Sequence, residues 1–206
     1  MQLQHPFGII TPTVDGEVLT VLAASHAEYT VGDLMDLIPR RSYNGIRNVV
    51  DRLAAQGIVR TRDIGRTRSY ALNDDHLLAP AVREIADVRR LLLRRLRSEV
   101  EAWGHPPLLG VLFGSAARSD MRVDSDLDVL LVRSADVDDE RWQPSVAELT
   151  ARATAWTGND ARIVDLDEED LRSHAHRPLL VSVAREGLTF TGDAGLLARA
   201  VSGRRT

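Results

Sequence analysis

The residues best suited to chemistry in this sequence are Asp126 and Asp128, at the start of an apolar run over 127–132. Side chains alternate faces along a β-strand, so both carboxylates project from one face while Leu127 and Val129 project from the other. Two carboxylates a few ångströms apart repel each other, and a divalent cation removes that repulsion. Because Mg²⁺ prefers oxygen ligands, the spacing indicates a magnesium site at the beginning of a strand.

A glycine and a serine lie shortly before this acidic pair. Gly114 and Ser115 follow the apolar run 111–113, and a short helix is predicted to start near Ala116. Glycine lets a ligand approach the backbone closely, and the first turn of a helix offers free N–H groups to phosphate. Phosphate-binding backbone beside metal-binding carboxylates indicates nucleotide chemistry.

Together these features resemble the motif of the DNA polymerase β-type nucleotidyltransferase superfamily, over roughly residues 108–192. The small bacterial "minimal" nucleotidyltransferase domains are most similar, and their Gly-Ser-x-Ala-Arg opening is matched by Gly114, Ser115, Ala117 and Arg118. The resemblance implies Mg²⁺-dependent transfer of a nucleoside monophosphate from an NTP to a hydroxyl. The nucleotide-binding residues that it implies are Gly114, Ser115, Arg118 and Ser125, and the metal ligands are Asp126 and Asp128.

The sequence departs from the superfamily at the third carboxylate that active members generally carry. The strand predicted over 161–166 should pair beside the acidic strand, and Arg162 stands at the place of this third acid. Arginine keeps its charge at physiological pH, so it cannot act as a base. Either Asp160, on the same face, supplies the third catalytic acid, or Arg162 neutralises Asp126 and Asp128 and leaves a site that binds nucleotide weakly or not at all.

The N-terminal part is predicted to form helices followed by a β-hairpin. The first helix is expected from Asp15 as its N-cap, and the second opens with a capping box between Thr30 and Asp33. The third begins at Ser42 and ends before Gly57. The hairpin is predicted from strands over 58–62 and 67–72, around a turn at 64–66.

This order of elements resembles a winged helix-turn-helix domain over about residues 14–73. The resemblance implies binding of double-stranded DNA, with the third helix in the major groove and the hairpin arginines on phosphates. A protein-binding or purely structural winged helix is the alternative. The DNA-binding residues implied are Ser42, Tyr43, Asn44, Arg47, Asn48, Arg62, Arg66 and Arg68.

Charge and composition separate the chain into a basic and an acidic part. Residues 39–68 hold eight arginines against two carboxylates, whereas residues 118–170 hold six arginines against fifteen. The sequence contains no lysine and no cysteine, which excludes disulfides and cysteine-ligated zinc. With no signal peptide and no apolar run near 18 residues, a cytoplasmic protein without membrane insertion is expected.

The predicted fold class is α+β. A winged helix-turn-helix over 1–73 is joined by a linking helix over 74–104 to a nucleotidyltransferase-like domain with a small mixed sheet over 105–206. Residues 74–103 are expected to form one long helix whose apolar stripe either packs within the chain or pairs with a second copy in a homodimer.

The combined interpretation is a DNA-binding transcription regulator with a nucleotidyltransferase-like domain, whose candidate catalytic residues are Asp126, Asp128 and Asp160. In one alternative that domain is inactive and senses a nucleotide or dimerises. In another it is an antitoxin or aminoglycoside-type nucleotidyltransferase, and the winged helix binds a partner protein.

Overall fold

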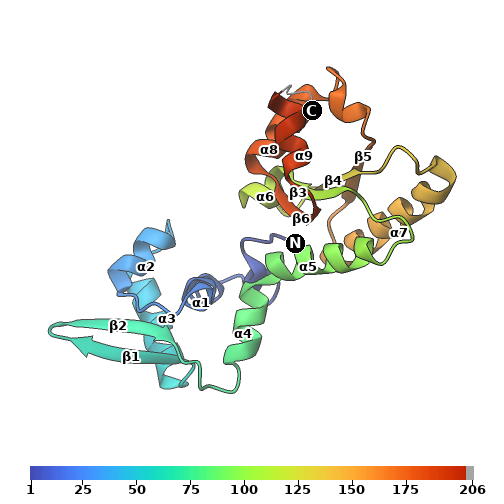
Figure 1. Ribbon diagram of the computed structural model, residues 1–206. Helices are drawn as coiled ribbons and strands as arrows, with labels where there is room; N and C mark the ends of the chain where they lie inside the picture. The colour runs from blue at the N-terminus through green and yellow to red at the C-terminus, as the bar shows by residue number, and fades with distance from the viewer. Residues whose placement is uncertain (203–206) are drawn as a thin grey trace. The chain divides into compact units, whose positions relative to one another are not determined.

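The computed structural model describes residues 1–202 and divides into two compact units. One unit spans His5–Val88, and the other combines Met1–Gln4 with the chain from Arg89 onward (Figure 1). The last residues of the predicted 105–206 domain, 203–206, lie outside the described part. Within that part, no helix has both the length and the hydrophobicity needed to cross a bilayer.

The N-terminal unit has the predicted order of helices followed by an antiparallel hairpin. Strand pairing runs from Val59 opposite Leu72 to Ile64 opposite Thr67. Gly65 turns the hairpin with a φ of 62°, a left-handed conformation that glycine adopts without strain. The elements are η1 (Pro6–Ile9), α1 (Val14–Ala24), α2 (Val31–Leu37), α3 (Tyr43–Ala55), β1 (Val59–Ile64), β2 (Thr67–Leu72) and α4 (Ala79–Ala86).

Helix starts in this unit agree with the sequence at α2 and α3 but not at α1. The Thr30 hydroxyl accepts from the Asp33 amide at 3.2 Å, and the Asp33 carboxylate accepts from the Thr30 amide at 2.7 Å, so the capping box is confirmed. The predicted N-cap at Asp15 is wrong, because α1 has Thr13 as its N-cap. The Asp15 carboxylate lies in the first turn and forms an ion pair with Arg52.

The α3 helix is amphipathic, and its apolar stripe enters the core of the unit as predicted. Full burial of one large apolar side chain stabilises the fold by about 1.5–3 kcal/mol. Because one face is committed to the core, the opposite face of α3 lies in solvent. The buried residues of α3 are Ile46, Val49, Val50 and Leu53, and the others around them include Val18, Leu22, Leu34, Tyr70 and Leu72.

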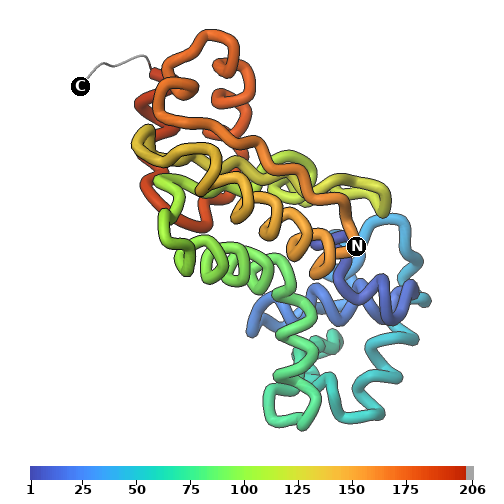
Figure 2. The backbone as a smooth tube through the Cα atoms, turned by 90° about the vertical axis from the view of Figure 1, so that its right-hand side faces the viewer, coloured from blue at the N-terminus to red at the C-terminus, as the bar shows by residue number. Residues whose placement is uncertain are grey.

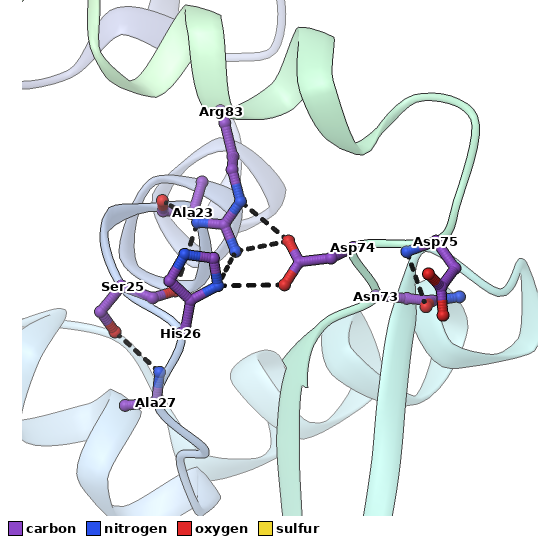
Figure 3. Close-up of polar contacts among 8 residues, drawn as sticks. All are labelled: Ala23, Ser25, His26, Ala27, Asn73, Asp74, Asp75 and Arg83. Carbon is purple, nitrogen blue, oxygen red and sulfur yellow. Dashed lines mark hydrogen bonds and ion pairs between the residues drawn. The ribbon is translucent and has the colours of Figure 1, made fainter.

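A polar cluster fixes α4 to the rest of the N-terminal unit (Figure 3). The Arg83 guanidinium donates to Asp74 Oδ1 from Nε at 2.9 Å and from Nη2 at 2.6 Å. Its Nη1 donates to the Ala23 carbonyl at 2.7 Å, and His26 Nδ1 lies 3.0 Å from Asp74 Oδ2. Arg83 therefore joins α4 to the loop after α1 and to the end of the hairpin.

The long helix predicted over 74–103 is instead two helices, α4 and α5 (Val88–Glu101). Asp87 lies between them with φ −93° and ψ 18°, outside helical geometry, and its amide donates to the Arg83 carbonyl at 2.9 Å. Aspartate competes with the backbone for hydrogen bonds and is a weak helix former. Apolar residues recur at helical spacing on both sides of Asp87, so the sequence pattern did not predict that the helix ends there.

The C-terminal unit is built on a small mixed sheet, as predicted, and its strand order is β5-β4-β3-β6. The β3 strand runs antiparallel to β4 and β6, and β5 runs parallel to β4, so the strand over 161–166 does pair beside the acidic strand. The strands are β3 (Leu109–Phe113), β4 (Leu127–Val132), β5 (Ala161–Leu166) and β6 (Leu188–Gly192). The other helices are α6 (Gly114–Arg118), α7 (Asp139–Thr157), η2 (Asp170–Arg172), α8 (Arg177–Glu186) and α9 (Gly195–Ser202).

Different helices cover the two faces of this sheet. One face packs Leu130 and Val132 of β4 against Leu180 and Val183 of α8 and Leu197 of α9. Asp128 precedes Leu130 by two residues on β4, so its side chain projects from the same face of the sheet.

The opposite face carries α7, which lies beside α5 (Figure 2). Trp142 of α7 donates from Nε1 to Asp165 Oδ1 of β5 at 2.8 Å, and its ring meets Trp103 edge-on at 5.2 Å. Asp138 caps the helix by accepting from the Arg141 amide at 3.0 Å.

Candidate functional site

The predicted metal-binding carboxylate Asp128 lies directly against Gly114. Asp128 pairs with Phe113 across the antiparallel β3–β4 ladder, which brings its side chain to the start of α6. Gly114 has a φ of 69°, and a Cβ atom there would overlap Asp128 Oδ2. Glycine is needed at this position for both reasons.

The sheet also brings Asp126 near Asp128, and their charges interact. Burial raises the pKa of Asp128, and the charge of Asp126 raises it further. The positive charges of Arg162 and Arg118 act in the opposite direction. A carboxyl whose pKa is raised at an acidic pair is a common feature of functional sites.

Arg162 lies within this acidic group. In the parallel β4–β5 ladder it pairs with Asp128, so the strands fix its backbone beside that residue. Its Nη1 lies 2.7 Å from Asp126 Oδ2 and its Nε lies 3.6 Å from Asp160 Oδ2. Asp160, the candidate third acid, is an exposed ion-pair partner of Arg162 here, and the guanidinium stands between it and Asp126.

This arrangement does not fit the magnesium ion that the sequence predicts. Among residues 1–202, no group of three His, Cys, Asp or Glu side chains is placed to hold a metal. The Arg162 side chain is 62% exposed, so breaking its ion pair costs at most about 1 kcal/mol. A guanidinium that swings about 6 Å away still repels a doubly charged ion by about 1.4 kcal/mol in water, a factor of about ten in affinity.

Arg118 is the second arginine, after Arg162, that departs from the expected nucleotide site. Its Nε donates to Asp120 at 3.1 Å and its Nη1 donates to Glu186 of α8 at 2.8 Å. These bonds raise the pKa of Arg118 and hold its guanidinium on two carboxylates. The sequence does not indicate the role of Glu186, since no local pattern links α8 to α6.

Ser125 belongs to the turn that leads into β4. Its hydroxyl accepts from the Arg122 amide at 2.8 Å, and its carbonyl accepts from Asn159 Nδ2 at 2.8 Å. Asn159 is 3% exposed and also accepts from the amino group of Met1 at 2.7 Å. Asn159 therefore positions the turn before the acidic pair, which the sequence did not indicate.

A second candidate site is a groove of about 480 Å³ in the N-terminal unit, between α2, α3 and the hairpin. Arginines and hydroxyl groups dominate its lining, together with two carboxylates. The lining residues are Thr30, Val31, Gly32, Tyr43, Arg47, Asp51, Asp63, Gly65, Arg66, Thr67, Arg68 and Tyr70.

The solvent face of α3 carries most of the predicted DNA-binding residues. Tyr43 is 49% exposed, and Asn44, Arg47 and Asn48 are exposed beside it. Ser42 is used as the N-cap, with its hydroxyl accepting from the Gly45 amide at 3.1 Å. The sequence thus placed these side chains on the surface correctly, apart from the structural role of Ser42.

Arg47 forms an exposed ion pair with Asp51, and the buried Tyr70 also contacts this carboxylate. Its Nε lies 3.5 Å from Asp51 Oδ2, while Tyr70 donates from its hydroxyl to Asp51 Oδ1 at 2.9 Å. Burial and the bond to Asp51 raise the pKa of Tyr70 to about 12, so its hydroxyl stays protonated.

The hairpin arginines differ in their partners. Arg68 donates to Asp63 at 2.8 Å, and Arg62 lies 3.7 Å from Glu28. Arg66 is exposed and has no carboxylate within ion-pair distance among residues 1–202. The unit as a whole holds nine arginines and eleven carboxylates over 5–88, so its positive charge is local to α3 and the hairpin.

The family comparison identifies a match in the C-terminal part of the chain. Residues 93–186 match the family model described as "Nucleotidyltransferase domain". No curated protein matches the chain.

Solved structures of toxin–antitoxin complexes show a weaker likeness. One with AMP-PNP is 23% identical, with a TM-score of 0.37, and the match covers 57% of this chain and 82% of that one. The tri-AMPylated HEPN toxin of Shewanella oneidensis in complex with the MNT antitoxin is 20% identical, with a TM-score of 0.39 and coverage of 56% and 85%. The assignment rests on the family model together with the mixed sheet and its acidic strand. The C-terminal unit of this protein is a nucleotidyltransferase-like domain.

Proposed function

We propose that this protein binds double-stranded DNA through α3 and the β1–β2 hairpin and acts as a transcription regulator that carries a nucleotidyltransferase-like domain. The observation that supports this most is the groove lined by Arg47, Arg66 and Arg68, next to the exposed polar face of α3. In this proposal residues 14–73 form a winged helix-turn-helix domain within the His5–Val88 unit.

Each part of the surface has a chemical role in this proposal. Asn44, Arg47 and Asn48 project from one end of α3, and amide and guanidinium groups can pair with adenine and guanine edges in the major groove. A good bidentate pair of this kind contributes about 1–3 kcal/mol of discrimination. Arg66, which has no carboxylate partner among residues 1–202, is free to neutralise a phosphate.

The test is selection from a random-sequence duplex pool with the full chain, followed by binding measurements on selected and unselected duplexes. Arg66→Ala is expected to weaken binding to both kinds of duplex by a similar factor, because a phosphate contact is independent of sequence. Arg47→Ala is expected to lower the preference for the selected duplex by about tenfold, because it loses a base contact.

Arg41→Ala is the matched control. Arg41 belongs to the same unit, but both its Nε and its Nη2 donate to Glu17, and it does not line the groove. If Arg41→Ala weakens DNA binding as much as Arg66→Ala, or if no duplex binds at all, the proposed surface is wrong.

Nucleotidyl transfer with Mg²⁺ and an NTP is the second candidate function, favoured by the family model over residues 93–186. Asp126 and Asp128 would hold the metal, and the acceptor would be a hydroxyl of a partner protein or of a small molecule. Incubation with each labelled NTP and Mg²⁺ tests it, and label transfer that Asp126→Ala abolishes would establish it. The Arg162–Asp126 ion pair opposes this function.

A further inference from the structure

The position of Arg162 is set by the backbone as well as by its side chain. Arg162 lies opposite Asp128 in a continuous parallel ladder that runs from Leu127–Ala161 to Val132–Leu166. The guanidinium can change rotamer, but the residue cannot leave the acidic group without breaking the ladder.

The guanidinium contacts two carboxylates and influences a third. It lies 2.7 Å from Asp126 and 3.6 Å from Asp160, and the strand pairing places Arg162 opposite Asp128. A divalent cation bound between acidic side chains would make the same kind of contacts. Arginine keeps its positive charge at this position, because no chelator removes it and it stays protonated.

We propose that Arg162 is a built-in cation. It takes the place of the divalent metal in this nucleotidyltransferase-like domain, so that the native chain binds no Mg²⁺ at Asp126 and Asp128. The inference rests on the geometry of the C-terminal unit and is independent of DNA binding by the N-terminal unit.

The proposal predicts that a single substitution opens a metal site. In Arg162→Asp the new aspartate takes the position opposite Asp128 on the neighbouring strand, and paired strands lie about 4.8 Å apart. Three carboxylates then converge without a cation between them, and oxygen ligands suit Mg²⁺ and Mn²⁺. Arg162→Ala removes the competing charge but adds no ligand, and should bind metal more weakly than Arg162→Asp.

The experiment is titration of the full chain with MnCl₂, followed by calorimetry and by the electron spin resonance signal of free Mn²⁺. Native protein should show no binding at millimolar Mn²⁺. Arg162→Asp should bind Mn²⁺ at least about tenfold more tightly than Arg162→Ala, and Asp126→Ala in the Arg162→Asp background should abolish that binding.

Two outcomes would overturn the proposal. Native protein that binds Mn²⁺ and loses it on Asp126→Ala would show that Arg162 does not occupy the metal's place, and this comparison needs no folded Arg162 variant. Equal metal affinity of a folded Arg162→Asp and Arg162→Ala would show that the position is not a ligand position. Melting curves without metal establish that each variant is folded, and DNA binding by the same samples is measured separately.

Discussion

Gly114 combines a left-handed backbone with a close approach to Asp128. Gly114→Ala is expected to destabilise the protein by about 3 kcal/mol, from backbone strain and from overlap with the carboxylate. Gly65→Ala is the matched control, because Gly65 has a similar φ of 62° but nothing within 4 Å of the added Cβ. It should cost only about 1 kcal/mol. Urea unfolding measures both, and equal losses would show that the contact with Asp128 is unimportant.

The charge of Arg162 should be visible in the titration of Asp128. Arg162 lowers the pKa of this carboxyl, while burial and Asp126 raise it. Arg162→Ala is therefore expected to shift the pKa of Asp128 upward, measured from carboxyl ¹³C chemical shifts across a pH series. Arg118→Ala should produce a smaller upward shift, since Arg118 has the weaker influence of the two. An unchanged or lower pKa in Arg162→Ala would contradict the electrostatic description of the site.

At the scale of the elements, the Arg83–Asp74 pair should make the N-terminal unit sensitive to acid. The hydrogen bonds from Arg83 hold the pKa of Asp74 below its ordinary value. Asp74 therefore stabilises the fold above the unfolded carboxyl pKa of about 3.9, and this contribution is lost as the pH falls through the lower folded value. Asp74→Asn should lower the unfolding midpoint at neutral pH and have no effect in strong acid. A loss that is the same at both pH values would exclude this linkage.

The contacts of Arg83 also predict how its removal affects stability. Arg83→Ala should destabilise the N-terminal unit by about 2 kcal/mol, because the bonds to Asp74 and to the Ala23 carbonyl are lost together. Arg97→Ala serves as the control, since the pair with Glu101 lies on an exposed helix face and contributes about 0.5 kcal/mol or less. Chemical denaturation compares the two, and similar losses would mean that Arg83 does not join the elements.

Elements with a strong local pattern could be predicted from the sequence. The strand over 161–166, the hairpin and the α2 capping box follow from alternation, turn residues and capping, which act over a few positions. The predicted pairing of β5 beside the acidic strand is also confirmed, so the sequence alone places Arg162 next to the acidic pair.

Features that depend on distant contacts could not be predicted. Glu186 reaches Arg118 across 68 residues, and Asn159 reaches Ser125 across 34. The end of α4 could not be predicted, because apolar residues continue at helical spacing on both sides of Asp87. Local periodicity reports which face of an element is apolar, and tertiary contacts decide where the element stops.

At the scale of the whole molecule, the two units carry different chemistry. The N-terminal unit concentrates positive charge on α3 and the hairpin, whereas the C-terminal unit is acidic over 118–170 and has an arginine at its predicted metal site. In the functions proposed above, the first unit binds nucleic acid, and Arg162 takes the place of the metal in the second. Loss of DNA binding on Arg66→Ala should leave the melting of the C-terminal unit unchanged.

The most direct test of the account is the affinity of the full chain for duplex DNA across a series of salt concentrations, measured by fluorescence anisotropy. If the arginines of α3 and the hairpin bind phosphates, the logarithm of affinity falls linearly with the logarithm of salt, by about 0.9 for each phosphate neutralised. Arg66→Ala should reduce that slope by about one unit. Absence of binding at low salt, or a slope that Arg66→Ala leaves unchanged, would contradict the assignment of the groove to DNA.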